Sequence, residues 1–188
     1  MVDEHTDGRG TTGTVHQLSV SGGGVPKLPV PEARVHVGGM AGDAQADRAH
    51  HGGPERALCL FALEQIEELQ AEGHPIAPGN AGENVTVVGL DWRRVVPGAR
   101  LRLGEEVLVE VSSYTSPCRT IAGWFADGDF NRMNQQTHPG WSRVYARVLE
   151  EGVLRQGDAV ELLDEPAAER VARAQPPTIR WRPPLESG

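Results

Sequence analysis

Hydrophobic and polar positions alternate in short stretches along this chain of 188 residues, and Gly, Pro and Asp separate the stretches. In residues 106–111 the alternation is clearest, because three valines share one face while Leu108 and Glu110 lie on the other. This period of two predicts a half-buried β-strand. The same pattern predicts further strands at 14–20, 33–37, 83–90, 99–104, 143–149 and 158–163.

One segment has a helical period instead. From about Ala62 to Ala71, Leu63, Ile66 and Leu69 fall on one side and glutamates on the other, which predicts an amphipathic helix. A glycine and a proline follow and end it. Short strands at this spacing, with one or two short helices, predict a mainly β fold. We expect a closed or nearly closed β-barrel, because closure removes unpaired strand edges.

The pattern divides the chain into three parts. Residues 1–13 are polar and glycine-rich, which predicts a flexible N-terminus. Residues 14–163 hold the predicted strands and form the expected barrel domain. In 164–188 the composition changes, and we expect a short C-terminal helix followed by an extended Pro-rich tail.

Composition narrows the functional classes. The formal net charge of −8 argues against a general nucleic-acid binder, which needs a basic face. The longest apolar run, residues 57–63, is far shorter than the roughly 20 residues of a membrane span. The first residues have neither the basic nor the apolar region of a signal peptide. We therefore expect a cytoplasmic protein with reduced thiols that binds neither membrane nor nucleic acid.

Cations accompany two glycine-rich loops. In SGGGVPK (21–27), bare backbone and Lys27 could surround an anion, although a flexible turn with a solvated lysine has the same pattern. In AHHGGPERAL (49–58), His51 and Arg56 flank two glycines and suit phosphate. A turn with surface histidines is the alternative there. Adjacent histidines point opposite ways in an extended segment, so this is not zinc spacing.

Two other polar segments are candidates for ligand contact. In GNAGENVTV (79–87), Asn84 lies where a loop enters a strand, and its amide can both donate and accept, as recognition of a heterocycle requires. A capped turn is the alternative. The long polar segment 123–140 could cover a pocket mouth or be a surface excursion. Its candidate substrate contacts are Arg132, Asn134 and His138.

The two cysteines stand in different surroundings. Cys118 follows the strand-like run and Pro117, and the neighbouring Arg119 would favour its thiolate, the form that acts as nucleophile or metal ligand. A small buried hydrophobe is the alternative. Cys59 lies in ALCLFAL and is predicted to fill the core. The sequence contains no P-loop, no GxGxxG between strand and helix, no HExxH and no GxSxG, which disfavours nucleotide-dependent and common hydrolase chemistry.

Taken together, the segments resemble the MOSC family, named after the C-terminal domain of molybdenum cofactor sulfurase. The resemblance rests on HHGGPERAL, GENVTV and a cysteine after a strand, in this order and spacing, and it spans about residues 14–163. The stand-alone bacterial members, including those that act on N-hydroxylated bases, are the most similar. The family is also associated with pyridoxal phosphate binding.

The resemblance implies a β-barrel whose basic pocket holds the molybdenum cofactor. Cys118 would then be the catalytic residue and the metal ligand, since a soft thiolate suits a metal that transfers oxygen. The positions that would hold the pterin and its phosphate are Lys27, His51, Arg56, Asn84, Arg119 and Arg143. Such relatives reduce N-hydroxylated small molecules. No iron–sulfur or flavin module is visible, so we expect separate electron-donor proteins of the flavin-reductase or ferredoxin type.

Two other functions remain open on the same residues. Cys118 could carry a persulfide in a sulfurtransferase, or the barrel could be a non-enzymatic module that binds an anion or a cofactor. The sequence does not separate the reductase from the sulfurtransferase, because a cysteine beside an arginine in a loop suits both activities.

Overall fold

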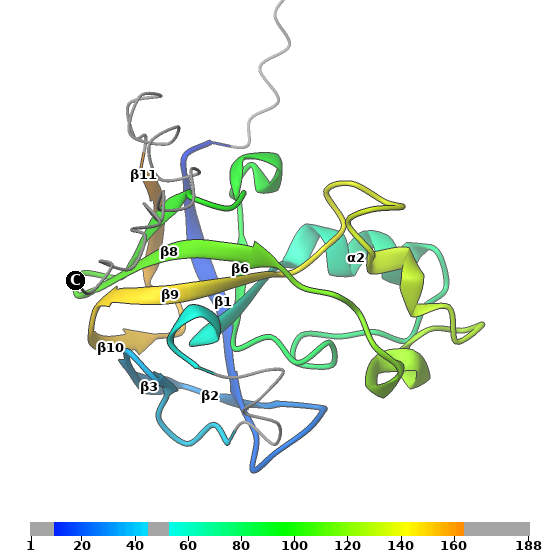
Figure 1. Ribbon diagram of the computed structural model, residues 1–188, viewed down its shortest axis with the longest axis horizontal. Helices are drawn as coiled ribbons and strands as arrows, with labels where there is room; N and C mark the ends of the chain where they lie inside the picture. Colours follow the sequence, from blue (N-terminus) through cyan, green and yellow to red (C-terminus); the bar gives the residue numbers. More distant parts are fainter. Residues whose placement is uncertain (1–9, 45–52, 164–188) are drawn as a thin grey trace, which may run out of the picture.

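The computed structural model describes residues 10–44 and 53–163 (Figure 1). Its strands are β1 Thr12–Val20, β2 Leu28–Val30, β3 Glu32–His36, β4 Gly39–Met40, β5 Leu58–Ala62, β6 Val85–Val88, β7 Arg100–Leu103, β8 Val107–Tyr114, β9 Val144–Glu150, β10 Gly152–Arg155 and β11 Ala159–Leu163. The helices are α2 Leu63–Ala71 and the 3-10 helices η1 Pro54–Arg56, η2 Trp92–Arg94, η3 Arg119–Trp124 and η4 Phe130–Met133.

The described strands close into a barrel, as the sequence pattern predicts. Seven of them pair in the order β11-β7-β8-β9-β5-β6-β1, and β1 returns to β11 through Thr12–Thr14. All pairs are antiparallel except β5 and β6, which are parallel. A parallel pair needs a crossover, and here α2 and the loop after it supply that connection. β2 extends the sheet beyond β1.

Two smaller parts flank the barrel. A three-stranded sheet, β10-β3-β4, lies on one side, and α2 with the η3–η4 segment lies on the other (Figure 1). Of the smaller sheet, only β3 is predicted by the sequence pattern. β4 and β10 of this sheet, and β2 beside β1, are too short or too close to turns to show a clear period.

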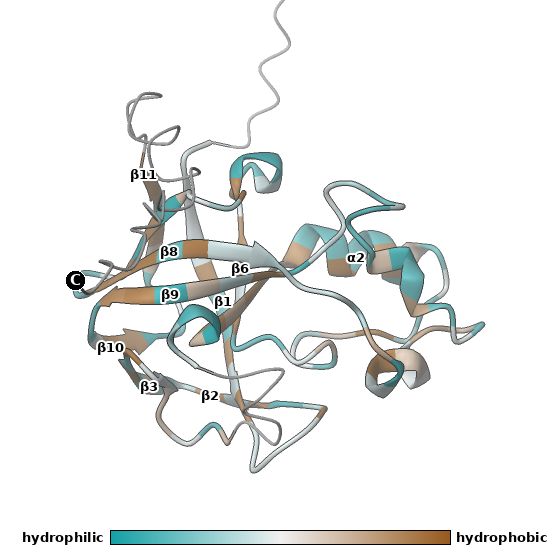
Figure 2. Cartoon of the chain, in the orientation of Figure 1, coloured by the Kyte–Doolittle hydropathy of each residue, from teal (hydrophilic) through white to brown (hydrophobic). Residues whose placement is uncertain are grey.

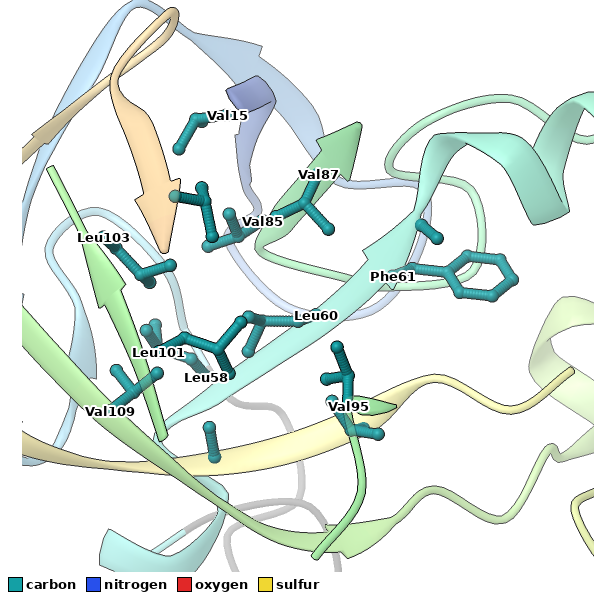
Figure 3. Close-up of a cluster of buried hydrophobic side chains, with 14 of the residues drawn as sticks. Val15, Leu58, Leu60, Phe61, Val85, Val87, Val95, Leu101, Leu103 and Val109 are labelled. Atoms are coloured by element: carbon teal, nitrogen blue, oxygen red, sulfur yellow. The ribbon is translucent and has the colours of Figure 1, made fainter. Parts of the chain in front are cut away.

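The barrel interior is the hydrophobic core. Leu58, Leu60, Val85, Leu101 and Leu103 point toward one another inside the barrel (Figure 3). Hydrophobic positions gather on the strands, while α2 has bands of both kinds (Figure 2). The side chains that face the interior come from strands far apart in the sequence, so closure of the barrel and burial of the core are the same event.

β5 is a strand that the sequence pattern does not reveal. All five of its residues are buried, so they read as one continuous apolar run without alternation. Leu58 and Leu60 face the barrel interior, whereas Phe61 points away (Figure 3). The Phe61 ring meets the Trp92 ring edge-on, with 6.3 Å between the ring centroids. β5 is thus covered on both faces. Because successive side chains of a strand point to opposite faces, Cys59 lies on the same face as Phe61, away from the barrel interior.

β8 is buried on both faces, so the prediction of a half-buried strand there is wrong. Leu108 is 9% exposed and Glu110 is 3% exposed, so both are buried like the valines, which are at most 1% exposed. Arg100 on β7 and Arg147 on β9 lie opposite Glu110 and bind its carboxylate at 2.9 and 2.6 Å. Cross-strand ion pairing therefore covers a polar position that the sequence pattern assigns to solvent.

The predicted helix is confirmed as α2. Ile66 and Leu69 are buried, while Leu63 is only partly covered. It ends as a Schellman motif, because the Gly73 N–H bonds the Gln70 carbonyl at 2.9 Å and the next N–H bonds the Leu69 carbonyl at 3.1 Å.

The predicted C-terminal helix and Pro-rich tail, and most of the predicted flexible N-terminus, lie outside the described residues. The division of the chain into three parts stays a prediction. Within 10–44 and 53–163, no helix is long and apolar enough to cross a membrane.

Candidate functional site

A cavity of about 310 Å³ lies beside β5 and β9, outside the barrel interior. Its walls come from Ala44 and from five segments that the fold brings together, 24–27, 56–59, 81–84, 116–121 and 143–145. Most of these segments are loops that follow or precede a barrel strand. The arrangement is that of a ligand site built from loops on a rigid scaffold.

Arg143 is the most deeply buried cation of the cavity wall. Only 7% of it is exposed, and its Nη1 donates to the carbonyl of Ala81. Its Nε is buried and has no hydrogen-bond partner within the described part of the chain. A buried guanidinium N–H without a partner costs free energy, so this atom is well suited to a ligand acceptor.

Glu83 and Cys59 are the buried ionisable neighbours of Arg143. Burial raises the pKa of Glu83, although hydrogen bonds and the Arg143 charge oppose the rise. Burial likewise raises the pKa of Cys59 to about 11. Burial thus favours the neutral form of both groups, and a neutral neighbour leaves the charge of Arg143 available to the cavity.

Lys27 and Asn84 belong to one hydrogen-bond network. The Lys27 ammonium binds the carboxylate of Asp43, and the Asn84 amide donates to the same oxygen at 2.9 Å and to the Ser19 carbonyl at 3.3 Å. The Asn84 carbonyl accepts from the Cys59 backbone N–H at 3.1 Å. Asn84 thus ties the cavity wall together, and its amide is not free to read a heterocycle in this arrangement.

Arg56 and Tyr145 form another part of the wall. The Arg56 guanidinium lies 5.5 Å from the centre of the Tyr145 ring, a cation–π distance. Tyr145 pairs with Cys59 across β9 and β5. Burial raises the pKa of Tyr145 to about 12, so its hydroxyl keeps its proton in the physiological range.

Cys118 lies at the cavity where the chain leaves β8 and enters η3. It is half-buried, and its Sγ is 2.8 Å from the Thr120 hydroxyl, which also lines the cavity. Arg119 is exposed and does not line the cavity, because the chain turns into η3 at this residue. The thiol therefore faces the cavity, while its basic neighbour in the sequence faces solvent.

The fold brings together five of the seven residues that the sequence suggests. Lys27, Arg56, Asn84, Cys118 and Arg143 line one cavity, although they are spread from residue 27 to residue 143. Arg119 is apart from them, and His51 lies outside the described residues.

The segment 123–140 does not line this cavity, nor do its candidate substrate contacts Arg132, Asn134 and His138. Arg132 binds the Glu72 carboxylate at 2.5 and 2.9 Å and stacks 3.5 Å from the Trp141 ring centre. The hydrogen bond from Arg132 holds the pKa of Glu72 below its usual value. These contacts fasten the segment to the end of α2.

Sequence reasoning missed several residues of the site. Cys59 is buried, as predicted, but its side chain also lines the cavity. Glu83 lies where a loop enters a strand but, like Asp43, is not among the predicted site residues, because a single acidic residue in a turn carries no signal of its own. Tyr145 and Cys59 could have been found from their positions in the strands. Each is next in the chain to a buried barrel residue, so its side chain points to the opposite face, and the two residues pair across adjacent strands.

A metal held by protein side chains alone is not supported. The described residues contain no group of three or more His, Cys, Asp or Glu side chains that could hold a metal ion. Cys118 is one soft donor on the cavity wall. This donor set suits a metal whose other ligands come from a cofactor.

Comparison with known proteins gives one family. The MOSC domain model matches residues 47–161. The chain is 37% identical over 144 residues to the uncharacterized protein YflK of Bacillus subtilis, which covers 74% of this chain and 63% of YflK. It is 31% identical over 153 residues to protein YiiM of Escherichia coli, and this match covers 79% of this chain and 66% of YiiM. The chain thus spans less than two thirds of either relative.

A more distant relative and a solved structure agree with this. A protein named reductase in Gibberella moniliformis is 31% identical over 133 residues, 68% of this chain and 23% of that protein. The crystal structure of YiiM from Geobacillus stearothermophilus matches with a TM-score of 0.64 and 26% identity, over 81% of this chain and 75% of that one. The fold and the sequence therefore lead to the same group of proteins.

Proposed function

The chain belongs to the MOSC domain family, and from this membership we propose that its cavity binds the molybdenum cofactor and that the protein reduces N-hydroxylated small molecules. The family is associated with that cofactor, and one relative is named a reductase. The observation that carries the proposal is a half-buried thiol, Cys118, on the wall of a cavity that also contains the buried and partly unpartnered Arg143.

The cavity residues fit such a cofactor. Its terminal phosphate needs positive partners, and Lys27, Arg56 and Arg143 reach the cavity from three separate segments. The unpartnered Nε of Arg143 supplies a donor that a phosphate oxygen would satisfy. Gly24 adds bare backbone to the wall, since no atom lies within 4 Å of where its side chain would begin.

Cys118 would ligate the metal through its Sγ. When bound, the molybdenum cofactor supplies two-electron oxygen-atom transfer, which converts an N–OH group into an N–H group. Thr120 is placed to hold the sulfur in orientation through the 2.8 Å contact of its hydroxyl. Val25, Ala81 and Ile121 contribute apolar wall, which reduces the water around the thiolate and strengthens the nearby charges.

The electrons are expected from separate donor proteins of the flavin-reductase or ferredoxin type. The carriers would have to reach Cys118, which lies in a loop at the edge of the barrel rather than in its interior. The substrate is expected to be a small N-hydroxylated molecule, since the cavity of about 310 Å³ must hold part of the cofactor as well.

Metal and pterin content test the proposal. The full chain is produced in a host that makes the cofactor, and molybdenum and oxidised pterin are measured in the purified protein. We expect near-stoichiometric molybdenum in the wild type and a loss of at least tenfold in Cys118→Ser, with reduction of an N-hydroxylated base lost in parallel. Glu105→Gln, at an exposed residue that does not line the cavity, is the control and should keep its molybdenum. Equal, negligible molybdenum in all three proteins would sink the proposal.

A sulfur-carrier function is the second candidate, because Cys118 is half-buried and accessible from a loop. Incubation with a cysteine desulfurase and free cysteine would then add one sulfur to Cys118, detected as a gain of about 32 Da by mass spectrometry. Cys59, whose thiol is protonated at pH 8 because its pKa is about 11, should stay unmodified. Absence of the adduct on Cys118 would reject this function.

A further inference from the structure

Asp43, just after β4, is a buried carboxylate that sequence reasoning did not select. Its side chain is 4% exposed, and three donors from separate segments converge on it. The Ser21 backbone N–H binds Oδ1 at 2.9 Å. The Asn84 amide binds Oδ2 at 2.9 Å, and the Lys27 ammonium binds the same oxygen.

Three convergent donors require a group that only accepts hydrogen bonds. An ionised Asp has acceptors on both oxygens, whereas an Asn of the same shape would turn its own N–H toward at least one donor. The charge is also needed, because the Lys27 side chain is itself only 11% exposed and a buried ammonium needs a counter-charge. The position therefore demands a carboxylate.

The pairing leaves Lys27 able to bind a ligand. An ammonium has three N–H donors, and within the described part of the chain Asp43 takes one of them. Lys27 also lines the cavity, so its remaining donors can serve an anion there. A lysine side chain is long and flexible, and Asp43 together with the tight backbone around it removes most of that freedom.

Asn84 links this pair to the rest of the wall. Its amide shares Oδ2 of Asp43 with Lys27, and its carbonyl holds the backbone N–H of Cys59. Asp43 thus connects the loop after β1 with the loop before β6 and, through Asn84, with β5. Loss of this carboxylate would release Lys27, whereas Asn84 would keep its hydrogen bonds with the Ser19 carbonyl and the Cys59 N–H.

We propose that Asp43 is the positioning residue of the cavity, holding the Lys27 ammonium where it meets the anionic group of the ligand. This rests on the proposed anion-binding role of the cavity. The direction in which anion affinity changes when the Asp43 carboxylate is removed distinguishes this positioning role from that of a simple counter-charge. A carboxylate that acted only as nearby negative charge would repel an anion, and its removal would tighten anion binding. A positioning carboxylate has the opposite effect, because without it the ammonium is no longer held in place.

The test measures binding of inorganic phosphate by NMR chemical-shift titration on the full chain. The proteins are the wild type, Asp43→Asn, Lys27→Met and the double variant. We expect Asp43→Asn to weaken phosphate binding about five- to tenfold, and to have no further effect in the Lys27→Met background. Asp127→Asn, in an exposed turn that does not line the cavity, is the matched charge control and should bind like the wild type.

Unchanged or tighter phosphate binding in Asp43→Asn overturns the proposal, as does equal weakening in the Lys27→Met background or a wild type that does not bind phosphate. If Asp43→Asn does not fold, a crystal structure of the wild type with phosphate decides. Lys27 must then contact both the anion and Asp43, and a Lys27 turned away from Asp43 overturns it. The expected phosphate pattern in a protein without molybdenum would reject the proposed function and leave this role of Asp43 intact.

Discussion

Glu83, next to the cavity residue Asn84 in the chain, shows how a single buried ionisable residue makes stability depend on pH. It is completely buried, and its Oε1 accepts from the Gly79 N–H at 2.6 Å and from the Thr86 hydroxyl at 3.2 Å. Its Oε2 has no partner among the described residues. Burial raises its pKa above the ordinary value of 4.5, so the folded protein holds a proton there that the unfolded chain releases.

This proton gives a pH-dependent prediction for Glu83→Gln. The contribution of the protonated carboxyl is fully present below pH 4.5 and is lost as the pH rises toward the raised pKa. The free energy of unfolding of the wild type should therefore fall relative to the Gln variant, by at most about 1.4 kcal/mol per pH unit. Urea unfolding from pH 4.5 to pH 8 measures it. The exposed Glu105→Gln is the control, and a pH-independent difference for Glu83→Gln would contradict the prediction.

At the scale of elements, the loop before β6 is held tightly against the loop after β1. The Lys27 backbone N–H donates to the Gly79 carbonyl at 2.9 Å, and Gly79 has a φ of 87°. A Cβ on Gly79 would lie 2.3 Å from the Lys27 carbonyl oxygen. Gly79 is needed for two reasons at once, the left-handed backbone and the close approach that sets Lys27 at the cavity.

Gly79→Ala should therefore lower the free energy of unfolding by more than a Gly→Ala change at a position that has only a left-handed backbone. Gly73→Ala is the matched control, because Gly73 has a φ of 94° and no atom within 4 Å of its added Cβ. We expect a loss of about 1–2 kcal/mol for Gly73→Ala and about 2 kcal/mol more for Gly79→Ala, measured by chemical unfolding. Phosphate affinity should fall only in Gly79→Ala. Equal losses in the two variants would show that the close approach does not matter.

At the scale of the whole molecule, barrel closure creates the site. β5 lies between β9 and β6, and it carries Leu60 on its interior face and Cys59 on the cavity face. The interior residues fix the strand, and the strand in turn fixes the wall of the cavity. The core and the cavity therefore share one structural element.

Leu60→Ala tests how strongly the barrel depends on this strand. Leu60 is fully buried in the barrel, so we expect a loss of about 2–5 kcal/mol in a single cooperative unfolding transition. Leu149, which is 40% exposed on β9, is the control, and Leu149→Ala should cost less than about 1 kcal/mol. Thermal and urea unfolding measure both. A small loss for Leu60→Ala would show that the barrel interior is loosely packed.

The sequence by itself determined the strands whose residues alternate and the helix that became α2, and it indicated a closed or nearly closed barrel. These follow from local periodicity and turn residues, which act over a few positions. It also suggested Cys118 and the cations around it as candidates. It could not reveal β5, whose burial on both faces removes the alternation, or the cover over Glu110, which comes from arginines on two other strands.

Only the tertiary structure decided which of these residues meet. Arg119 is next to Cys118 in the chain yet faces solvent, whereas Arg143 is 25 positions from Cys118 and lines the same cavity. The pairing of Asp43 with Lys27 depends in the same way on two loops held together by the barrel. Contacts between distant segments are set by strand order and register, and no local pattern of side chains encodes them.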